Sequence, residues 1–144
     1  MSNHSIIFKD TSGLAVIQLT DICRIFPESY DFWDGNWINA NVSIDLEYFK
    51  AEYPIEFQLD NLVELHRQML GIYNFEIKRA QFEMREHGLY IEFTVERNGG
   101  ITCTVEARYD QACLGFIYHT DFAEIQKLSH RLEKIAELFP LRLK

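Results

Sequence analysis

The sequence predicts an α+β fold, in which an antiparallel β-sheet meander or two-sheet sandwich carries one short inserted helix and a long C-terminal helix packed on it. Two observations lead to this prediction. Apolar residues recur at every second position through most of the chain, which is the period of a strand with one buried face. Two segments, residues 60–70 and 121–139, carry apolar residues at helical spacing instead.

Before residue 60 the chain contains four segments with the alternation of strands, at 5–9, 14–26, 37–47 and 52–59. The third alternates most regularly, and the apolar side chains that point to one of its faces are Ile38, Ala40, Val42, Ile44 and Leu46. The fourth contains Pro54, which cannot donate a hydrogen bond to a neighbouring strand. Pro54 therefore predicts that this strand lies at a sheet edge or contains a bulge.

The inserted helix is predicted to begin after Asp60, which is a suitable N-cap, and to end near Leu70 with Gly71 just beyond it. Four more segments have the pattern of strands, at 80–84, 89–97, 101–109 and 114–119. The middle two form the strongest hairpin signal in the chain, because the Asn-Gly-Gly sequence at 98–100 tolerates positive φ.

The C-terminal helix has clear signals at both ends. Asp121 and Glu124, three residues apart, resemble a capping box with Asp in place of Ser or Thr. Apolar residues then recur at helical spacing as far as Phe139, and Pro140 follows directly, where a helix cannot continue.

Length and composition fit one globular domain covering residues 1–144. No apolar run approaches the roughly 18 residues of a membrane span, and the first residues lack the features of a signal peptide, so we expect a cytoplasmic protein. Cys23, Cys103 and Cys113 show no metal-binding spacing. Their neighbours are apolar and strand-like, which predicts buried and unreactive thiols.

The negative charge of the chain is concentrated in one segment. The formal net charge is -8, and residues 28–64 contain nine acidic residues but a single basic one, Lys50, so this segment accounts for all of it. Both tryptophans lie in the same segment. A pI near 5.1 argues against nucleic acid or an anionic membrane as a direct partner and is compatible with a basic protein partner.

Asp31, Trp33, Asp34 and Trp37 form the first candidate site. A metal site is one interpretation of the two aspartates, but the ligand spacing of an EF-hand loop is absent. A structural turn at 34–36, with the sequence Asp-Gly-Asn, explains the pattern more simply. A rigid turn can also present an aromatic anchor to a partner, so the two tryptophans serve binding if they are exposed.

Asp45, Glu47, Glu52 and Glu56 form the second candidate site. If segments 37–47 and 52–59 pair, these acids lie on the face away from the apolar residues, where like charges on neighbouring strands repel. The face is either simply solvated or an electrostatic docking surface for a cationic partner. A glycosidase-type pair of carboxylates is a third interpretation, but the sequence singles out no pair.

Motifs for catalysis, cofactors and metals are missing from the sequence. It contains no HExxH, GxSxG, Walker or GxGxxG pattern. We therefore expect no enzyme activity, no cofactor and no bound metal, and we favour protein binding as the function. Two alternatives remain: a small ligand-binding β-rich module with an apolar pocket, and a hydrolase that uses paired carboxylates.

Residues 30–38, together with 114–116, 120–121 and 139–140, resemble the WapI-like family of bacterial immunity proteins. The residues of the first stretch that carry the resemblance are Asp31, Trp33, Asp34, Asn36 and Trp37. In length and element order the resemblance covers nearly the whole chain. It implies a small cytoplasmic protein that binds and neutralises one toxin domain, and it implies no catalytic residues. The acidic segment would suit a basic toxin, such as a nuclease.

Overall fold

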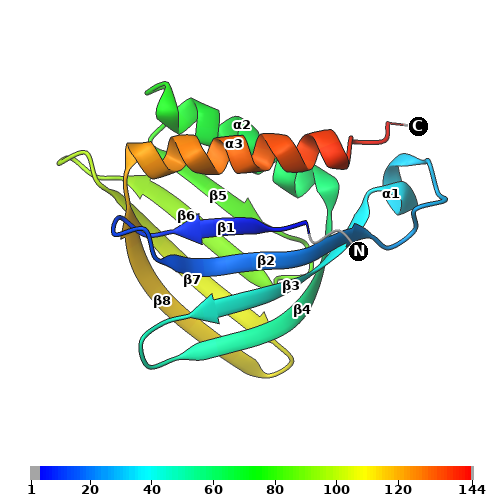
Figure 1. The fold of residues 1–144 in the computed structure, drawn as a ribbon, viewed down its shortest axis with the longest axis horizontal. Coiled ribbons are helices and arrows are strands. Elements are labelled where there is room, and N and C mark those ends of the chain that lie inside the picture. Colours follow the sequence, from blue (N-terminus) through cyan, green and yellow to red (C-terminus); the bar gives the residue numbers. More distant parts are fainter. Residues whose placement is uncertain (1–3, 144) are drawn as a thin grey trace.

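The computed structural model describes residues 4–143, which form two four-stranded antiparallel sheets and three helices (Figure 1). The first sheet consists of β1 (Ile6–Lys9), β2 (Ala15–Arg24), β3 (Trp37–Asp45) and β4 (Lys50–Gln58), in that order. The second consists of β5 (Arg79–Glu83), β6 (Leu89–Val95), β7 (Ile101–Tyr109) and β8 (Ala112–Thr120), in that order. The helices are α1 (Phe32–Gly35), α2 (Leu59–Tyr73) and α3 (Phe122–Leu138). The predicted α+β class is confirmed.

The chain runs twice through the same succession of four strands and a helix. β1 to β4 lead into α2, and β5 to β8 lead into α3, while α1 is a single turn inserted between β2 and β3. Each meander joins sequential neighbours, as short antiparallel connections favour. No helix among the described residues has the length and apolar character needed to cross a membrane.

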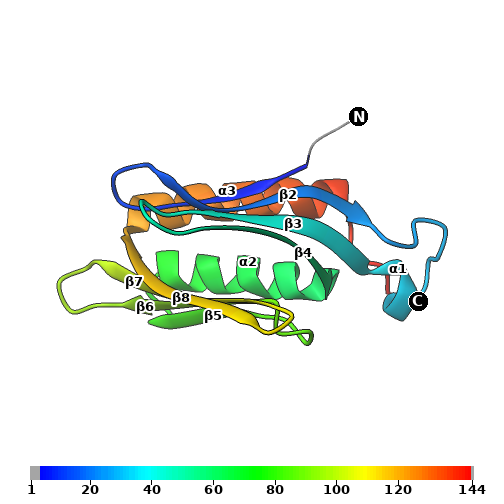
Figure 2. The ribbon, with the colours of Figure 1, turned by 90° about the horizontal axis from the view of Figure 1, so that it is seen from below.

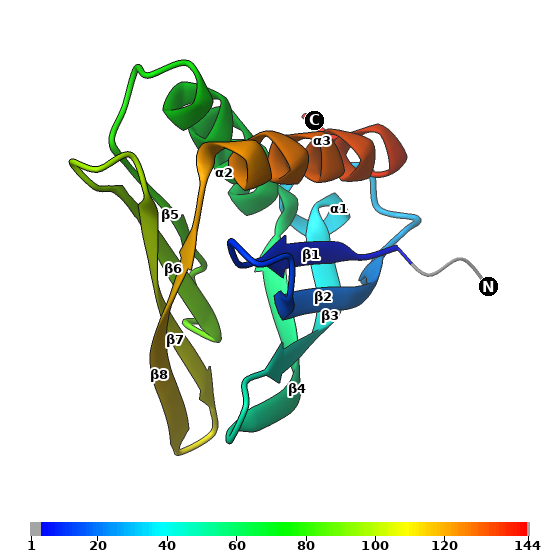
Figure 3. The same ribbon diagram turned by 60° about the vertical axis from the view of Figure 1, so that its left-hand side comes forward.

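The two sheets are inclined to one another, and α2 and α3 lie side by side across the space between them (Figures 2 and 3). The buried residues of both sheets and both helices form one continuous core. Phe57 of β4 meets Phe82 of β5 edge to face, with ring centroids 5.8 Å apart. Tyr53 of β4 donates a hydrogen bond to the Gly88 carbonyl at 2.7 Å, and burial raises the pKa of this hydroxyl. These contacts fix β4 against the second sheet.

Pro54 lies on β4, which pairs only with β3 and is therefore an edge strand. This confirms the prediction from proline. The predicted pairing of the two acidic segments is also confirmed, because β3 and β4 pair antiparallel without a bulge. The apolar residues of β3 are directed into the core.

The predicted ends of the inserted helix are wrong by a few residues. α2 begins at Leu59 with Gln58 as its N-cap, so Asp60 lies in the first turn. Gly71, predicted to follow the helix, is buried inside it, and a Cβ there would lie 3.0 Å from the Ile77 side chain. The glycine therefore permits the close approach of the chain that follows the helix.

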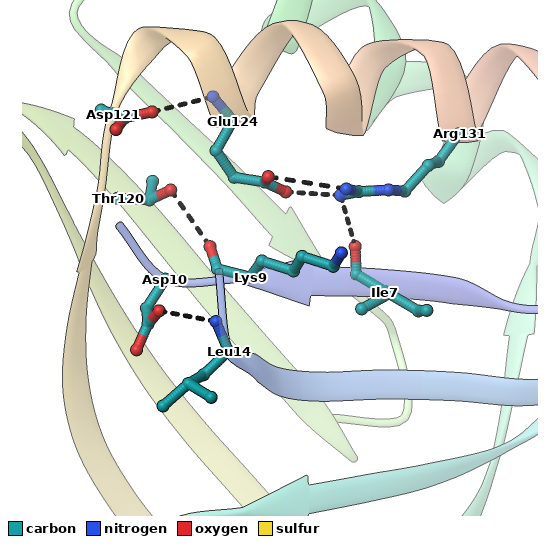
Figure 4. Close-up of polar contacts among 8 residues, drawn as sticks. All are labelled: Ile7, Lys9, Asp10, Leu14, Thr120, Asp121, Glu124 and Arg131. Carbon is teal, nitrogen blue, oxygen red and sulfur yellow. Dashed lines mark hydrogen bonds and ion pairs between the residues drawn. The ribbon is translucent and has the colours of Figure 1, made fainter. Parts of the chain in front are cut away.

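α3 begins after Asp121, as predicted. The Asp121 carboxylate accepts a hydrogen bond from the Glu124 amide at 2.9 Å (Figure 4). The buried Glu124 carboxylate turns to Arg131 rather than back to the N-cap. Arg131 also donates to the Ile7 carbonyl at 2.9 Å, so this ion pair attaches α3 to β1.

The prediction of three buried cysteines is wrong for two of them. Cys103 is buried, and burial raises the pKa of its thiol to about 12, as expected for an unreactive thiol. Cys23 and Cys113 are exposed because each occupies an outward-facing position of its strand. Apolar neighbours in sequence do not determine which face of a strand a residue occupies.

Candidate partner-binding surface

Residues 30–37 fold into a corner around the single-turn helix α1. Asp31 is the N-cap of this helix, and its carboxylate accepts a hydrogen bond from the Asp34 amide at 3.1 Å. Gly35 lies so close to the preceding chain that a Cβ would come within 2.3 Å of the Ser29 carbonyl oxygen, so only glycine fits. The predicted turn is thus present as one turn of helix.

The corner binds the C-terminal segment through Asn36, which has an exposed fraction of 0%. The Asn36 side-chain nitrogen donates to the carbonyls of Phe32 and Arg142, at 2.8 Å each. The Asn36 side-chain oxygen accepts from the Arg142 amide at 2.9 Å. The Arg142 guanidinium in turn lies over the Tyr30 ring, 4.3 Å from its centroid. Buried amides need such partners, so the corner and the C-terminal segment stabilise one another.

The stretches near residues 36 and 140, which carry the sequence resemblance, therefore meet in space. Arg24 of β2 connects them, because its guanidinium donates to the carbonyls of Gly35 and Pro140. Most residues of this motif therefore have a structural role, because they hold the corner and the C-terminal segment together. Trp33 differs, because it is 59% exposed and makes its ring contact with Phe32 of the same turn.

The four predicted corner residues differ in exposure. Asp31, Trp33 and Asp34 are exposed, whereas Trp37, at the start of β3, is half-buried. Trp33 therefore meets the condition for an aromatic anchor more fully than Trp37 does.

The acids of β3 and β4 lie on the outward face, as predicted, but they are not opposite one another. Asp45 faces Lys50 and forms an ion pair with it. Glu52 faces Ser43, and Glu56 faces Asn39. In this register no two acids are directly opposite one another, so the repulsion that was expected between facing like charges is absent. Among the described residues, no ion pair involves Glu47, Glu52 or Glu56.

The candidate residues are spread along the strands rather than gathered in one cleft. At 3.3 Å per residue, Trp37 and Asp45 lie about 26 Å apart along β3, and Glu52 and Glu56 lie about 13 Å apart along β4. Asp45 and Glu52 are diagonal neighbours on this face, but Lys50 already pairs with Asp45, so the spacing of the strand acids singles out no glycosidase pair. Within residues 4–143 no group of His, Cys, Asp or Glu side chains could hold a metal ion.

A groove of about 430 Å³ opens between the β3–β4 hairpin and the β7–β8 hairpin. Its lining includes Phe49, Tyr53, Tyr109 and Leu114, with Glu52 beside them. Phe49 and Tyr109 are exposed, and Tyr109 packs on the buried Tyr53 with ring centroids 5.9 Å apart. The two hairpins together thus present an aromatic surface next to one acid, Glu52, and one base, Lys50.

A second hollow, of about 570 Å³, adjoins β4 and shares Tyr109 with the groove. It brings together two of the predicted residues, Trp37 and Glu56. Glu86 and Asp110 also line it, and Arg108 is the one cation among its lining residues. With three acids and one base, its lining carries a net negative charge, which agrees with the charge of the segment around it.

Sequence reasoning missed Tyr109, Asp110 and Glu86 as members of this surface. They lie outside the acidic segment and come close to β4 only through the packing of the two sheets. One local signal was available for Asp110, because it lies between two segments with the pattern of strands, where a turn is expected. In the structure it lies in the β7–β8 turn with a φ of 56°. The proximity of that turn to β4 has no local signal.

Comparisons with known proteins give a family and distant likenesses to solved structures. Residues 7–140 match the family described as "Immunity protein WapI-like family". A comparison with curated proteins found no match. One similar structure, "Crystal structures of trypanosoma bruciei MRP1/MRP2", has 8% identity and a TM-score of 0.49, covering 96% of this chain and 86% of that chain. Another, "Structure of a guideRNA-binding protein complex bound to a gRNA", has 8% identity and a TM-score of 0.49, covering 94% and 89%. Likenesses at this level carry no argument about function.

Proposed function

Because the chain belongs to the WapI-like family of immunity proteins, we propose that it neutralises a cognate bacterial toxin domain by stoichiometric binding, in the cytoplasm of the cell that makes both. Neutralisation by binding needs a complementary surface rather than catalytic groups. The acids that the sequence singled out fit that requirement, because they are distributed over the α1 corner and the β3–β4 hairpin and are exposed.

We propose that the toxin contacts the turn before β4, the outer side of β4 and the two hollows beside it, here called the β4 surface. Its members are Glu47, Glu52, Glu56, Glu86, Tyr109 and Asp110. The observation that supports this choice is the exposed Tyr109 ring, which lines both hollows, where four carboxylates outnumber the two cations Lys50 and Arg108. Asp45 contributes less, because Lys50 already neutralises it. We propose Trp33, Asp31 and Asp34 as a second contact region. A toxin domain would reach it if the domain extends along the whole of β3.

A basic toxin fits this surface, and a nuclease is the class that we propose. A nuclease binds a polyanion and therefore carries a cationic groove. Carboxylates spaced along an extended strand would occupy or border such a groove. They would raise the association rate, while the buried aromatic contacts would determine how slowly the complex dissociates.

The test is a kinetic measurement with the toxin domain encoded beside this chain. The double variant Glu52→Lys and Glu56→Lys should lower the association rate by about tenfold or more and reduce its salt dependence. A matched double variant on the exposed side of α3, Glu133→Lys with Glu137→Lys, makes the same charge change away from β4 and should have a much smaller effect. Equal effects of the two double variants would place the toxin elsewhere.

The aromatic part of the proposal has its own readout. Tyr109→Ala should mainly raise the dissociation rate, because a central ring is lost while the charges remain. Trp33→Ala tests the corner independently. If only Trp33→Ala raises the dissociation rate, the toxin binds at the corner and not at the β4 surface.

A further inference from the structure

Two of the four outer sheet edges are paired by side chains from the helices. On β1, Arg131 of α3 donates to the Ile7 carbonyl at 2.9 Å. On β5, Gln68 of α2 accepts from the Gln81 amide at 2.8 Å and donates to the Gln81 carbonyl at 3.3 Å. Exposed strand edges attract other strands unless they are covered or charged, and these two are covered.

The edge of β4 is protected by its side chains. The β3–β4 hairpin is closed by a hydrogen bond from the Leu46 amide to the Phe49 carbonyl at 2.9 Å, which fixes the alternation of the ladder. Pro54 consequently directs its ring nitrogen to the free edge, where the missing N–H costs no ladder bond. Glu52 and Glu56 occupy the same set of positions. Proline and charge are the usual protections against strand addition.

β8 is the fourth edge, and it has neither protection (Figures 1 and 3). Residues 112–120 contain no acidic residue, Lys, Arg or proline. Tyr109 and Ala112 close a two-residue turn, so the backbone groups of Cys113, Gly115 and Ile117 point away from β7. Within residues 4–143 no hydrogen bond reaches those outward groups. Ile117 is 60% exposed.

We propose that β8 pairs antiparallel with β8 of a second copy of this chain, joining the two second sheets into one continuous sheet. The strand is self-complementary about Gly115. With Gly115 opposite Gly115 of the partner subunit, Cys113 faces Ile117 of the partner subunit, so a small side chain meets a large one. The Thr11 amide, which donates to the His119 carbonyl at 2.9 Å, ends the available edge at Ile117.

The distribution of charge favours a second copy over a basic toxin at this strand. Each chain has a formal net charge of -8, but the excess lies at residues 28–64, outside the second sheet. Two copies can therefore meet at β8 without apposing their charged residues, whereas a basic protein gains no electrostatic attraction there. The start of β8, at Cys113 and Leu114, also lines the groove beside β4, so the pairing would adjoin the proposed toxin surface.

The expected dimer is concentration-dependent. Only five residues of each strand would contribute to the interface. Its buried area would therefore be smaller than the roughly 1,200 Å² that stable interfaces bury. Sedimentation velocity over a wide concentration range should show the mass rise from 17.0 kDa toward twice that value. Ile117→Lys should keep the chain monomeric throughout, because it places a charge on an edge strand that has none, and charged edges resist strand addition.

Thr104→Lys is the matched control. Thr104 faces Ile117 across the β7–β8 ladder and is exposed, so it places the same charge on the same face but away from the edge. It should leave the dimer intact, and circular dichroism should show both variants folded. A wild-type chain that stays monomeric at every concentration overturns the proposal. It is also overturned if Ile117→Lys abolishes toxin binding without changing the mass, since the toxin is then the occupant of β8.

A cross-link tests the register. Residues opposite each other in a hydrogen-bonded antiparallel pair have Cα atoms about 5.5 Å apart, which a disulfide can span. In a Cys23→Ser, Cys113→Ser background, Gly115→Cys should form a disulfide-linked dimer on oxidation, and its Cβ meets nothing closer than the Val105 carbonyl at 3.9 Å. Ile117→Cys in the same background should not cross-link. Cross-linking of both variants to the same extent contradicts the symmetric register.

Discussion

Asn36 illustrates how one polar residue can connect distant parts of the chain. It is fully buried, and its amide joins the α1 corner to the backbone of Arg142. The desolvation of a buried amide is offset only when each of its polar atoms has a partner. Asn36 meets this condition through contacts separated by 106 residues in sequence.

Replacing Asn36 with Ala should lower the free energy of unfolding by about 2–3 kcal/mol, because it leaves the carbonyl and amide of Arg142 without their partner. Chemical denaturation of the two proteins measures this difference. The matched control is Asn41→Ala on β3, where the side chain is exposed and makes one weak contact with Asp21 at 3.3 Å. Its effect should stay within about 0.5 kcal/mol. Equal losses for the two variants would contradict the role given to Asn36.

At the scale of elements, the sequence predicted the strands well and the helix ends less well. Strands are specified by alternation, and β3 shows why: its apolar residues fill the core side almost without exception. Helix ends depend on competing signals. Both Asp60 and Asp121 are suitable N-caps in sequence, yet only Asp121 accepts a capping hydrogen bond, while β4 continues directly into α2 at Gln58.

The two aspartates therefore predict different effects of the same substitution. Asp121→Ala should lower the free energy of unfolding by about 1 kcal/mol, the usual cost of losing an N-cap. Asp60→Ala should cost a few tenths of a kcal/mol, because it removes only a favourable charge in the first turn. Thermal or denaturant unfolding distinguishes them. The reverse order would mean that α2 begins where the sequence alone suggested.

The features that the sequence could not predict depend on contacts between segments that are distant in the chain. The α1 corner was predicted as a turn and contains the exposed Trp33, but its contact with residue 142 has no local signal. Similarly, the exposure of Cys23 follows from a bulge in β2, with Asp21 at positive φ, that shifts the register against β3. A bulge depends on the pairing of two strands and leaves little trace in one of them.

At the scale of the whole molecule, the duplicated arrangement of four strands and a helix separates two kinds of surface. β4 carries proline and unpaired acids and adjoins the acidic hollow. β8, in the other sheet, is uncharged. We assign the first to a basic toxin and the second to another copy of the chain. Four of the nine acids in the segment 28–64 belong to the β3–β4 hairpin, and the others lie in or just before the α1 corner and in α2.

The central claim is that the chain neutralises its toxin by binding it. The most direct measurement titrates the toxin domain encoded beside this chain with the purified protein, following heat of binding and toxin activity together. We expect one toxin domain bound per chain, with activity falling in proportion to the fraction bound. A toxin that keeps full activity at saturating protein, or that loses activity at far less than one chain per toxin, would contradict stoichiometric neutralisation.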